Sequence, residues 1–130
     1  VQDWRQMYQV EIQCYYDVPE EERLNPEQEL HLFRVIQEAV HNAVRHGKAN
    51  KITIRVKAHR HKIFFEVTDN GNGFKADTIA PKGLGLKHMT ERIHMLHGEI
   101  KWSSEVGGPT RIEGFVPIND RSLVGRTDEQ

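Results

Sequence analysis

The stretch KITIRVKAHRHKIFFEVTDNGNGF, residues 51–74, decides the fold of this chain. Its segments 51–58 and 62–69 alternate apolar and polar side chains and are rich in β-branched and aromatic residues, which predicts two strands. The segment HRHK, residues 59–62, joins them as a hairpin. The end of the stretch, DNGNGF (69–74), has two interpretations: a tight turn after the strand, or the floor of a ligand site.

The segments on either side of this hairpin supply two helices and further strands. Asn25 is a suitable N-cap and Pro26 a suitable first residue for a long helix that runs to about His46 and stops at Gly47. A second helix is predicted from about 83 to 97, with Gly98 as its stop. The remaining elements are a strand at 8–16, a polar loop at about 70–82, and a last hairpin, 99–105 and 110–118, across VGGP.

Helices and antiparallel hairpins are segregated in this order of elements, which predicts an α+β fold. We expect a two-layer α/β sandwich, in which a mixed, mostly antiparallel sheet carries helices on one face and is partly solvated on the other. The expected organisation is a linker remnant at 1–7, one domain at 8–118 and a flexible tail at 119–130.

Composition narrows the class of protein. The 130 residues fit one domain, and 18 basic against 19 acidic residues give a net charge of −1, which does not favour nucleic acid or an anionic membrane as a partner. The single Cys14 excludes an internal disulfide and disfavours a structural zinc site. No apolar run approaches the roughly 20 residues of a membrane span, and we expect no signal peptide, because no basic start with an apolar centre is found. We interpret the chain as a cytoplasmic piece of a larger protein.

The long helix has two different sides at about 100° per residue. On one side Glu38, Asn42 and then Arg45 or His46 lie one turn apart. This order of carboxylate, amide oxygen and cation suits a magnesium ion followed by phosphate oxygens, although a solvated face is the common alternative. The opposite, apolar side is the expected core face and consists of Leu32, Phe33, Ile36, Ala39, Val40, Ala43 and Val44.

A second glycine cluster, GLGL (83–86), opens the second helix. Its backbone N–H groups can face an anion at a helix N-terminus. The signal is weak alone, because glycines before a helix are often only punctuation. The cluster is neither a Walker A loop, since no GK[ST] follows, nor a Rossmann fingerprint.

Three segments in this order resemble a known family. QEAVHNAVRHGKANKITIRV (37–56), DNGNGF (69–74) and KGLGLKHMTERIHMLHGEIKWSSEVGGPT (82–110) resemble the N, G1 and G2 boxes of the ATP-binding domain of sensor histidine kinases. This domain has the Bergerat fold of the GHKL superfamily. The likeness is to the NarX/DesK/LiaS-like subgroup, which signals to NarL-type response regulators, and it covers about 8–118.

The resemblance implies ATP and Mg²⁺ as ligands and gives roles to particular residues. Asp69 accepts the adenine amino group, Asn42 binds magnesium, and Glu38 is the acidic catalytic residue, which either orients water on the ion or assists proton transfer. The other nucleotide-contacting positions that it implies are Arg45, His46, Gly71, Gly73, Phe74, Gly83, Leu84, Gly85, Leu86 and Thr110.

The resemblance has departures and rivals. The usual G-x-G-T pattern is GGPT here, so Pro109 weakens the assignment of Thr110, and no phosphoacceptor motif of the E-R-x-R-I-A-x-E-L-H-D kind occurs. The chain therefore resembles the catalytic half of a kinase. A free-standing anti-sigma-factor serine kinase, a non-catalytic nucleotide-binding module and a gyrase-like ATPase are the alternatives.

The resemblance also implies partners. The expected reaction is transfer of the γ-phosphoryl to a His on the parent's own dimerisation domain, and then to an Asp of a NarL-type response regulator. The resemblance leaves membrane anchoring of the full-length kinase open. We expect the isolated domain to be monomeric.

Overall fold

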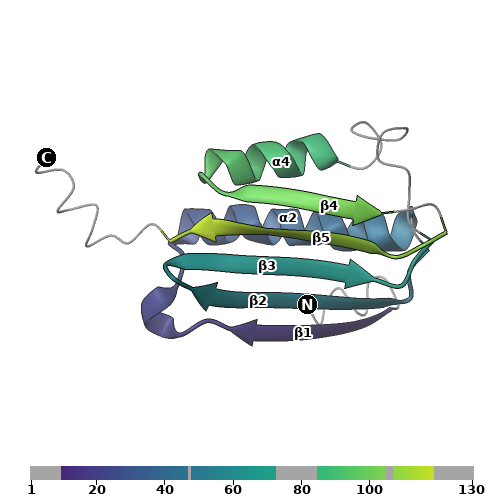
Figure 1. The fold of residues 1–130 in the computed structure, drawn as a ribbon, viewed down its shortest axis with the longest axis horizontal. Helices are drawn as coiled ribbons and strands as arrows, with labels where there is room; N and C mark the ends of the chain where they lie inside the picture. Colours follow the sequence, from purple (N-terminus) through teal and green to yellow (C-terminus); the bar gives the residue numbers. More distant parts are fainter. Residues whose placement is uncertain (1–9, 47, 73–84, 105–106, 119–130) are drawn as a thin grey trace, which may run out of the picture.

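The computed structural model describes residues 10–46, 48–72, 85–104 and 107–118, which form one sheet with helices on one of its faces (Figure 1). This arrangement confirms the expected α+β fold. The expected linker remnant at 1–7 and tail at 119–130 lie outside the described residues. The elements are β1 (Glu11–Asp17), the short 3₁₀ helix η1 (Glu20–Glu22), α2 (Pro26–Arg45), β2 (Lys51–His59), β3 (Lys62–Asp69), α4 (Leu86–Met95), β4 (Glu99–Ser104) and β5 (Thr110–Pro117).

The sheet has five strands in the order β1-β2-β3-β5-β4. β1 runs parallel to β2, with Glu11 opposite Lys51, and α2 connects the two strands. The other three pairings are antiparallel, so the sheet is mixed and mostly antiparallel, as predicted. The β2–β3 hairpin turns through Arg60 and His61, both at positive φ, which is the backbone of a primed two-residue turn.

The start of α2 is fixed by the predicted cap. Asn25 Oδ1 accepts a hydrogen bond from the Gln28 N–H (2.8 Å), and Gln28 Oε1 accepts one from the Asn25 N–H (3.1 Å). These two bonds form a capping box, and Pro26 follows the cap as the first residue of the helix. Gln28 also donates from Nε2 to the carbonyl of Pro117 (2.7 Å). The helix start is therefore tied to the last residue of β5. The expected stop at Gly47 lies outside the described residues, and the helix ends at Arg45.

The core is continuous from α2 through the sheet to α4, but the prediction for Phe33 was wrong. Val35 is fully buried, whereas Phe33 is 45% exposed. The reason is that α2 is covered on two sides, by the sheet and by α4. The row His31, Val35, Glu38 and Asn42 faces α4, since His31 Nδ1 lies 2.9 Å from Arg92 Nη1 and Glu38 lies against Gly85 at the start of α4.

The second helix is shorter than predicted at both ends. α4 begins at Leu86, and the predicted first residues Gly83 and Leu84 lie outside the described residues. At its end His97, not Gly98, takes the left-handed conformation (φ 64°). The Gly98 N–H donates to Ile93 O and the His97 N–H to His94 O, both at 2.9 Å, which is a Schellman motif. Gly98 is required because a Cβ there would overlap the Phe115 carbonyl.

The face of the sheet opposite the helices carries charged side chains. Arg111 pairs with Glu66 (2.6 Å) and with Glu113 (2.9 Å), and Lys101 pairs with Glu113 (3.2 Å). These exposed cations confirm the expected solvated face. No helix within the described ranges is long and apolar enough to cross a bilayer.

Candidate functional site

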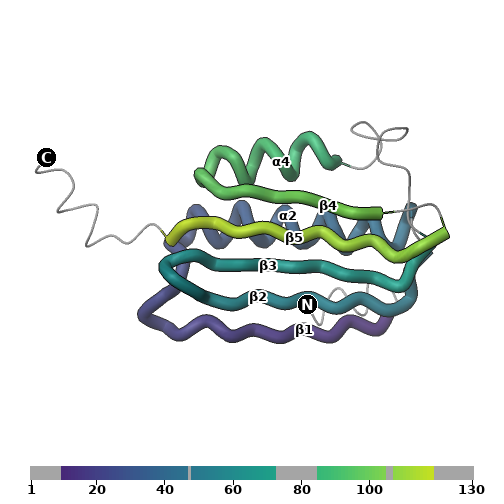
Figure 2. Tube along the Cα trace, viewed as in Figure 1, coloured from purple at the N-terminus to yellow at the C-terminus, as the bar shows by residue number. Residues whose placement is uncertain are grey.

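Several predicted site segments meet at one end of the sheet. The last turn of α2, the start of β2, the end of β3, the start of β5 and the start of α4 all lie there, as the trace in Figure 2 shows. These segments are far apart in the sequence. The fold therefore gathers the N-box helix, the beginning of the G1 loop and the end of the G2 cluster in one place.

Glu38 and Gly85 are in direct contact across the α2–α4 interface. A Cβ added to Gly85 would lie 2.5 Å from Oε1 and 2.9 Å from Cδ of Glu38, so the glycine leaves the space that the carboxylate occupies. Gly85 has φ 66° and is the N-cap of α4, where its carbonyl accepts the first helical hydrogen bond from the Met89 N–H. The carboxylate thus sits at a helix N-terminus, whose dipole favours negative charge.

The rest of the α2 row is graded from buried to exposed. Asn42, one turn after Glu38, is buried at 2% exposure, although polar residues of this kind are normally at the surface. Arg45 and His46 are exposed at the end of the helix. Leu86, in contrast, is fully buried in the core, so only its backbone could face a ligand.

Asp69, Gly71 and Thr110 form a second group at the end of β3. Asp69 Oδ1 accepts a hydrogen bond from the Gly71 N–H at 2.7 Å, which closes a turn. Burial raises the pKa of the half-buried Asp69 carboxyl, and the backbone N–H groups of Gly71 and Thr110 act in the opposite direction. Thr110 is buried, and its hydroxyl lies 2.7 Å from Ser104 Oγ. The carboxylate caps the turn with one oxygen and keeps acceptor capacity for a ligand.

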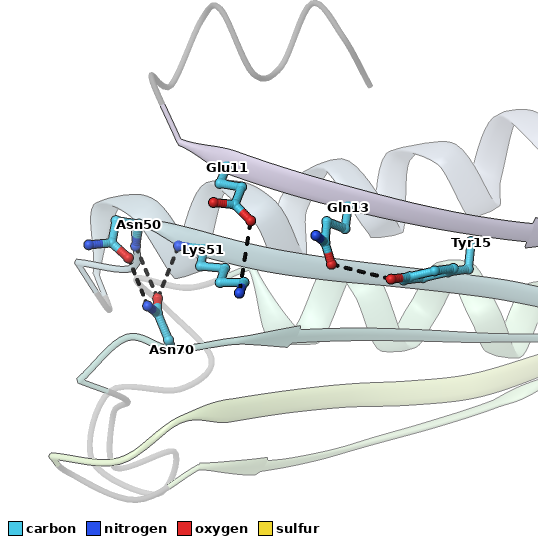
Figure 3. A network of polar contacts seen from close by, with 6 residues as sticks. All are labelled: Glu11, Gln13, Tyr15, Asn50, Lys51 and Asn70. Atoms are coloured by element: carbon cyan, nitrogen blue, oxygen red, sulfur yellow. Dashed lines mark hydrogen bonds and ion pairs between the residues drawn. The ribbon is translucent and has the colours of Figure 1, made fainter.

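Sequence reasoning missed the residue after Asp69. The side chain of Asn70 bonds to Asn50 and Lys51 at the start of β2, as Figure 3 shows. The only signal in the sequence was an asparagine directly after a strand, which ordinary turn chemistry also explains. Its partners lie about twenty residues away and follow from the pairing of β2 with β3.

Four predicted positions, Gly73, Phe74, Gly83 and Leu84, lie outside the described residues. A hollow of about 460 Å³ lies on the helix-free face of the sheet and borders Phe64 and Phe115. None of the predicted site residues lines it. Within the described ranges no cluster of three or more His, Cys, Asp or Glu side chains is placed to hold a metal ion.

The residues present fit a magnesium–nucleotide ligand. Glu38 and Asn42 offer carboxylate and amide oxygens, which are the ligand atoms that magnesium takes in proteins. Arg45 is an exposed cation at the end of the same helix, and Asp69 presents an acceptor at the end of β3. The arrangement offers hard oxygen ligands, a cation for phosphate and an acceptor for an exocyclic amine.

Comparison with known proteins identifies the family. Residues 27–120 match the family described as histidine kinase-, DNA gyrase B- and HSP90-like ATPases. The chain is 41% identical over 88 residues to the sensor histidine kinase LiaS of Bacillus subtilis, covering 68% of this chain and 24% of LiaS. It is 35% identical over 113 residues to the histidine-protein kinase/phosphatase DegS of the same organism, covering 85% of this chain and 29% of DegS.

Solved structures show the same fold. The histidine kinase domain of the blue-light activated kinase from Erythrobacter litoralis EL346 matches with a TM-score of 0.73 at 15% identity, over 95% of this chain and 59% of that one. The kinase AdeS of Acinetobacter baumannii matches with a TM-score of 0.64 at 19% identity, over 92% and 59%. The chain spans about a quarter of the length of LiaS and DegS. It belongs to the family of histidine kinase-, DNA gyrase B- and HSP90-like ATPases, and its curated relatives LiaS and DegS are a sensor histidine kinase and a signal transduction histidine-protein kinase/phosphatase.

Proposed function

We propose that this chain is the catalytic, ATP-binding domain of a sensor histidine kinase. It holds Mg·ATP and donates the γ-phosphoryl to a histidine on the parent's separate dimerisation domain. The phosphoryl group then passes to an aspartate of a NarL-type response regulator. The observation that carries the proposal is the contact of Glu38 with Gly85, one turn from buried Asn42 and at the same end of the sheet as Asp69.

Each group has a share in this reaction. Magnesium, when bound, neutralises phosphate charge during phosphoryl transfer. Asn42 offers it an amide oxygen, and Arg45 and His46 contact the phosphates. Glu38 orients water or takes part in proton transfer, and Asp69 accepts the amino group of adenine. In the transfer step the imidazole nitrogen bonds to the γ-phosphorus while the bond from that phosphorus to the β,γ-bridging oxygen breaks, and ADP leaves. The protein contributes mainly the positions of the reacting groups and the neutralisation of charge.

Replacing Asn42 by alanine tests the magnesium ligand. We expect the affinity for ATP in the presence of magnesium to fall about tenfold, since one oxygen ligand of the ion is lost while the phosphates still hold it. The affinity for ATP measured after a chelator has removed magnesium should change little. Titration calorimetry with and without magnesium measures both quantities, and circular dichroism checks the fold. Equal losses with and without magnesium would contradict this role of Asn42.

Transfer to histidine distinguishes the proposal from its rivals. Mixed with ATP alone, the chain should not label itself. Supplied with the dimerisation segment of its own parent, it should label that segment with an acid-labile, base-stable phosphate, as expected for phosphohistidine. Radiolabelled ATP and acid or base treatment measure this outcome. Acid-stable label on a partner serine would instead identify an anti-sigma-factor kinase.

The same proposal implies a cellular location and an oligomeric state for the domain. We propose a cytoplasmic location for this domain, where ATP is supplied. The isolated domain is proposed to be a monomer, because its expected pairing surface is the separate dimerisation domain. The balanced charge of the chain gives no reason to expect nucleic acid as a partner.

A further inference from the structure

We propose that Asn70 is a positioning residue for Asp69: its side chain locks the end of β3 to the residues that follow α2. It thereby holds the Asp69 carboxylate, which recognises the adenine base, at a fixed position relative to Arg45 and His46, which contact the phosphates. This inference rests on the proposed function, because it assigns a geometric role in the same nucleotide site.

The contacts of Asn70 are unusually complete for an exposed asparagine (Figure 3). Its Oδ1 accepts hydrogen bonds from the backbone N–H groups of Asn50 (3.1 Å) and Lys51 (3.0 Å). Its Nδ2 donates to Asn50 Oδ1 at 2.7 Å, and its backbone N–H donates to the carbonyl of Lys51 at 3.2 Å. Both ends of one side-chain amide are therefore engaged by the same short segment.

That segment is itself anchored to α2. The N–H of Ala49 donates to the carbonyl of Ala43 at 2.8 Å, and Ala49 is buried. On the other side the carbonyl of Asn50 accepts from the Glu11 N–H at 3.0 Å, which joins the segment to β1. A continuous series of contacts thus leads from the last turn of α2 through Ala49 and Asn50 to Asn70, which is the residue next to Asp69.

Asp69 has a second set of contacts from the opposite direction. Its carboxylate takes the N–H of Gly71, and the N–H of Thr110 on β5 also reaches it. The carbonyl of Asn72 accepts from the N–H of Gly107 before β5. These bonds orient the carboxylate relative to β5, whereas the side chain of Asn70 connects the same loop to Asn50 and Lys51, which follow α2. Removing the side chain loosens this second side, where the backbone bond from Asn70 to Lys51 remains.

The test compares base discrimination among matched variants of this chain. Asn70→Ala removes three side-chain bonds and leaves the backbone one. Asn50→Ala removes only the bond to Nδ2. Asn70→Asp keeps an acceptor for both backbone N–H groups, and Asn50 can turn its amide to donate to it. Gln28→Ala is the control for stability, because it removes the bonds to Asn25 and Pro117 at the far end of the sheet.

We expect the ratio of ATP to GTP affinity, measured by calorimetry on each folded variant, to narrow roughly three- to tenfold in Asn70→Ala, as the loss of one or two net hydrogen bonds predicts. Asn50→Ala should narrow it less, and Asn70→Asp should retain it. Gln28→Ala should lower the melting temperature and leave the ratio unchanged. This pattern separates positioning from general stability.

Three results would overturn the inference, and they distinguish its failure from the failure of base recognition by Asp69. If the wild type prefers ATP and Asn70→Ala keeps that preference, or if Asn70→Asp narrows it as much as Asn70→Ala, the positioning role fails while the proposed function stands. If the wild type binds ATP and GTP equally, base reading by Asp69 fails, and the role of Asn70 fails with it.

Discussion

Replacement of Asp69 by asparagine is expected to weaken ATP binding by about 5- to 150-fold, the cost of losing a buried hydrogen bond of about 1–3 kcal/mol. The new amide still has an oxygen for the Gly71 N–H, which the carboxylate accepts at 2.7 Å. Its –NH₂ group then faces the adenine amino group, so a donor meets a donor. The preference for ATP over GTP, whose six-position carbonyl cannot donate, should narrow. Paired titrations of both nucleotides against both proteins measure these effects.

The free protein provides the control for this substitution. Burial raises the pKa of Asp69, so the protonated form is favoured in the folded state relative to the unfolded one. The ionised carboxylate therefore opposes folding above its folded-state pKa, and stability falls as the pH rises through that value. Asparagine removes the charge, so the melting temperature at neutral pH should stay the same or rise. A large fall in melting temperature together with equal affinities for ATP and GTP would show that Asp69 only caps the turn.

Replacement of Gly85 by alanine should slow phosphoryl transfer by at least about 100-fold while leaving most of the fold stability. The Cβ would lie 2.5 Å from Oε1 of Glu38, and the flexible carboxylate can move away more easily than the backbone. Displacing an acid–base group costs roughly 10²–10⁴ in rate. The left-handed backbone at Gly85 (φ 66°) adds about 1–2 kcal/mol of strain for any other residue. Labelling of the parent's histidine measures the rate.

Two comparisons separate the displaced carboxylate from backbone strain. Gly107 also has positive φ (85°), but a Cβ there meets nothing within 4 Å, so Gly107→Ala carries strain without displacing Glu38. In a Glu38→Ala background, Gly85→Ala should add little further loss of rate, because the group that it displaces is already absent. Equal losses with and without Glu38, or a loss in Gly107→Ala as large as in Gly85→Ala, would contradict the assignment.

The parts of the fold that sequence predicted are those set by neighbouring residues. The capping box at Asn25 and Gln28 depends on a spacing of three residues, and the β2–β3 hairpin depends on local alternation and a two-residue turn. Spacing along the chain does not predict the contact between Glu38 and Gly85. The resemblance to the kinase family places both residues in one nucleotide site, and the structure brings them together.

Tertiary contacts account for the positions that sequence did not predict. Phe33 has an apolar side chain at a core-like spacing, but the second covered side of α2 faces α4 and buries Val35 instead. Gly98 has the residue type of a helix stop, whereas its function is to let Phe115 approach, and His97 takes the unusual backbone angle. The partners of Asn70 could not be predicted from the sequence, because they depend on the register of β2 against β3.

The parallel pairing of β1 with β2 has a consequence for how the chain assembles. Each hairpin forms from adjacent residues, but β1 finds its partner only after the whole of α2 has been closed into a loop between Asp17 and Lys51. Such closure costs chain entropy before any contact compensates for it, and parallel pairs of this kind form slowly. During synthesis β1 therefore stays unpaired until β2 has left the ribosome. The edge residues Cys14, Tyr15 and Tyr16, exposed even in the folded protein, then form a segment that is open to mispairing with another chain.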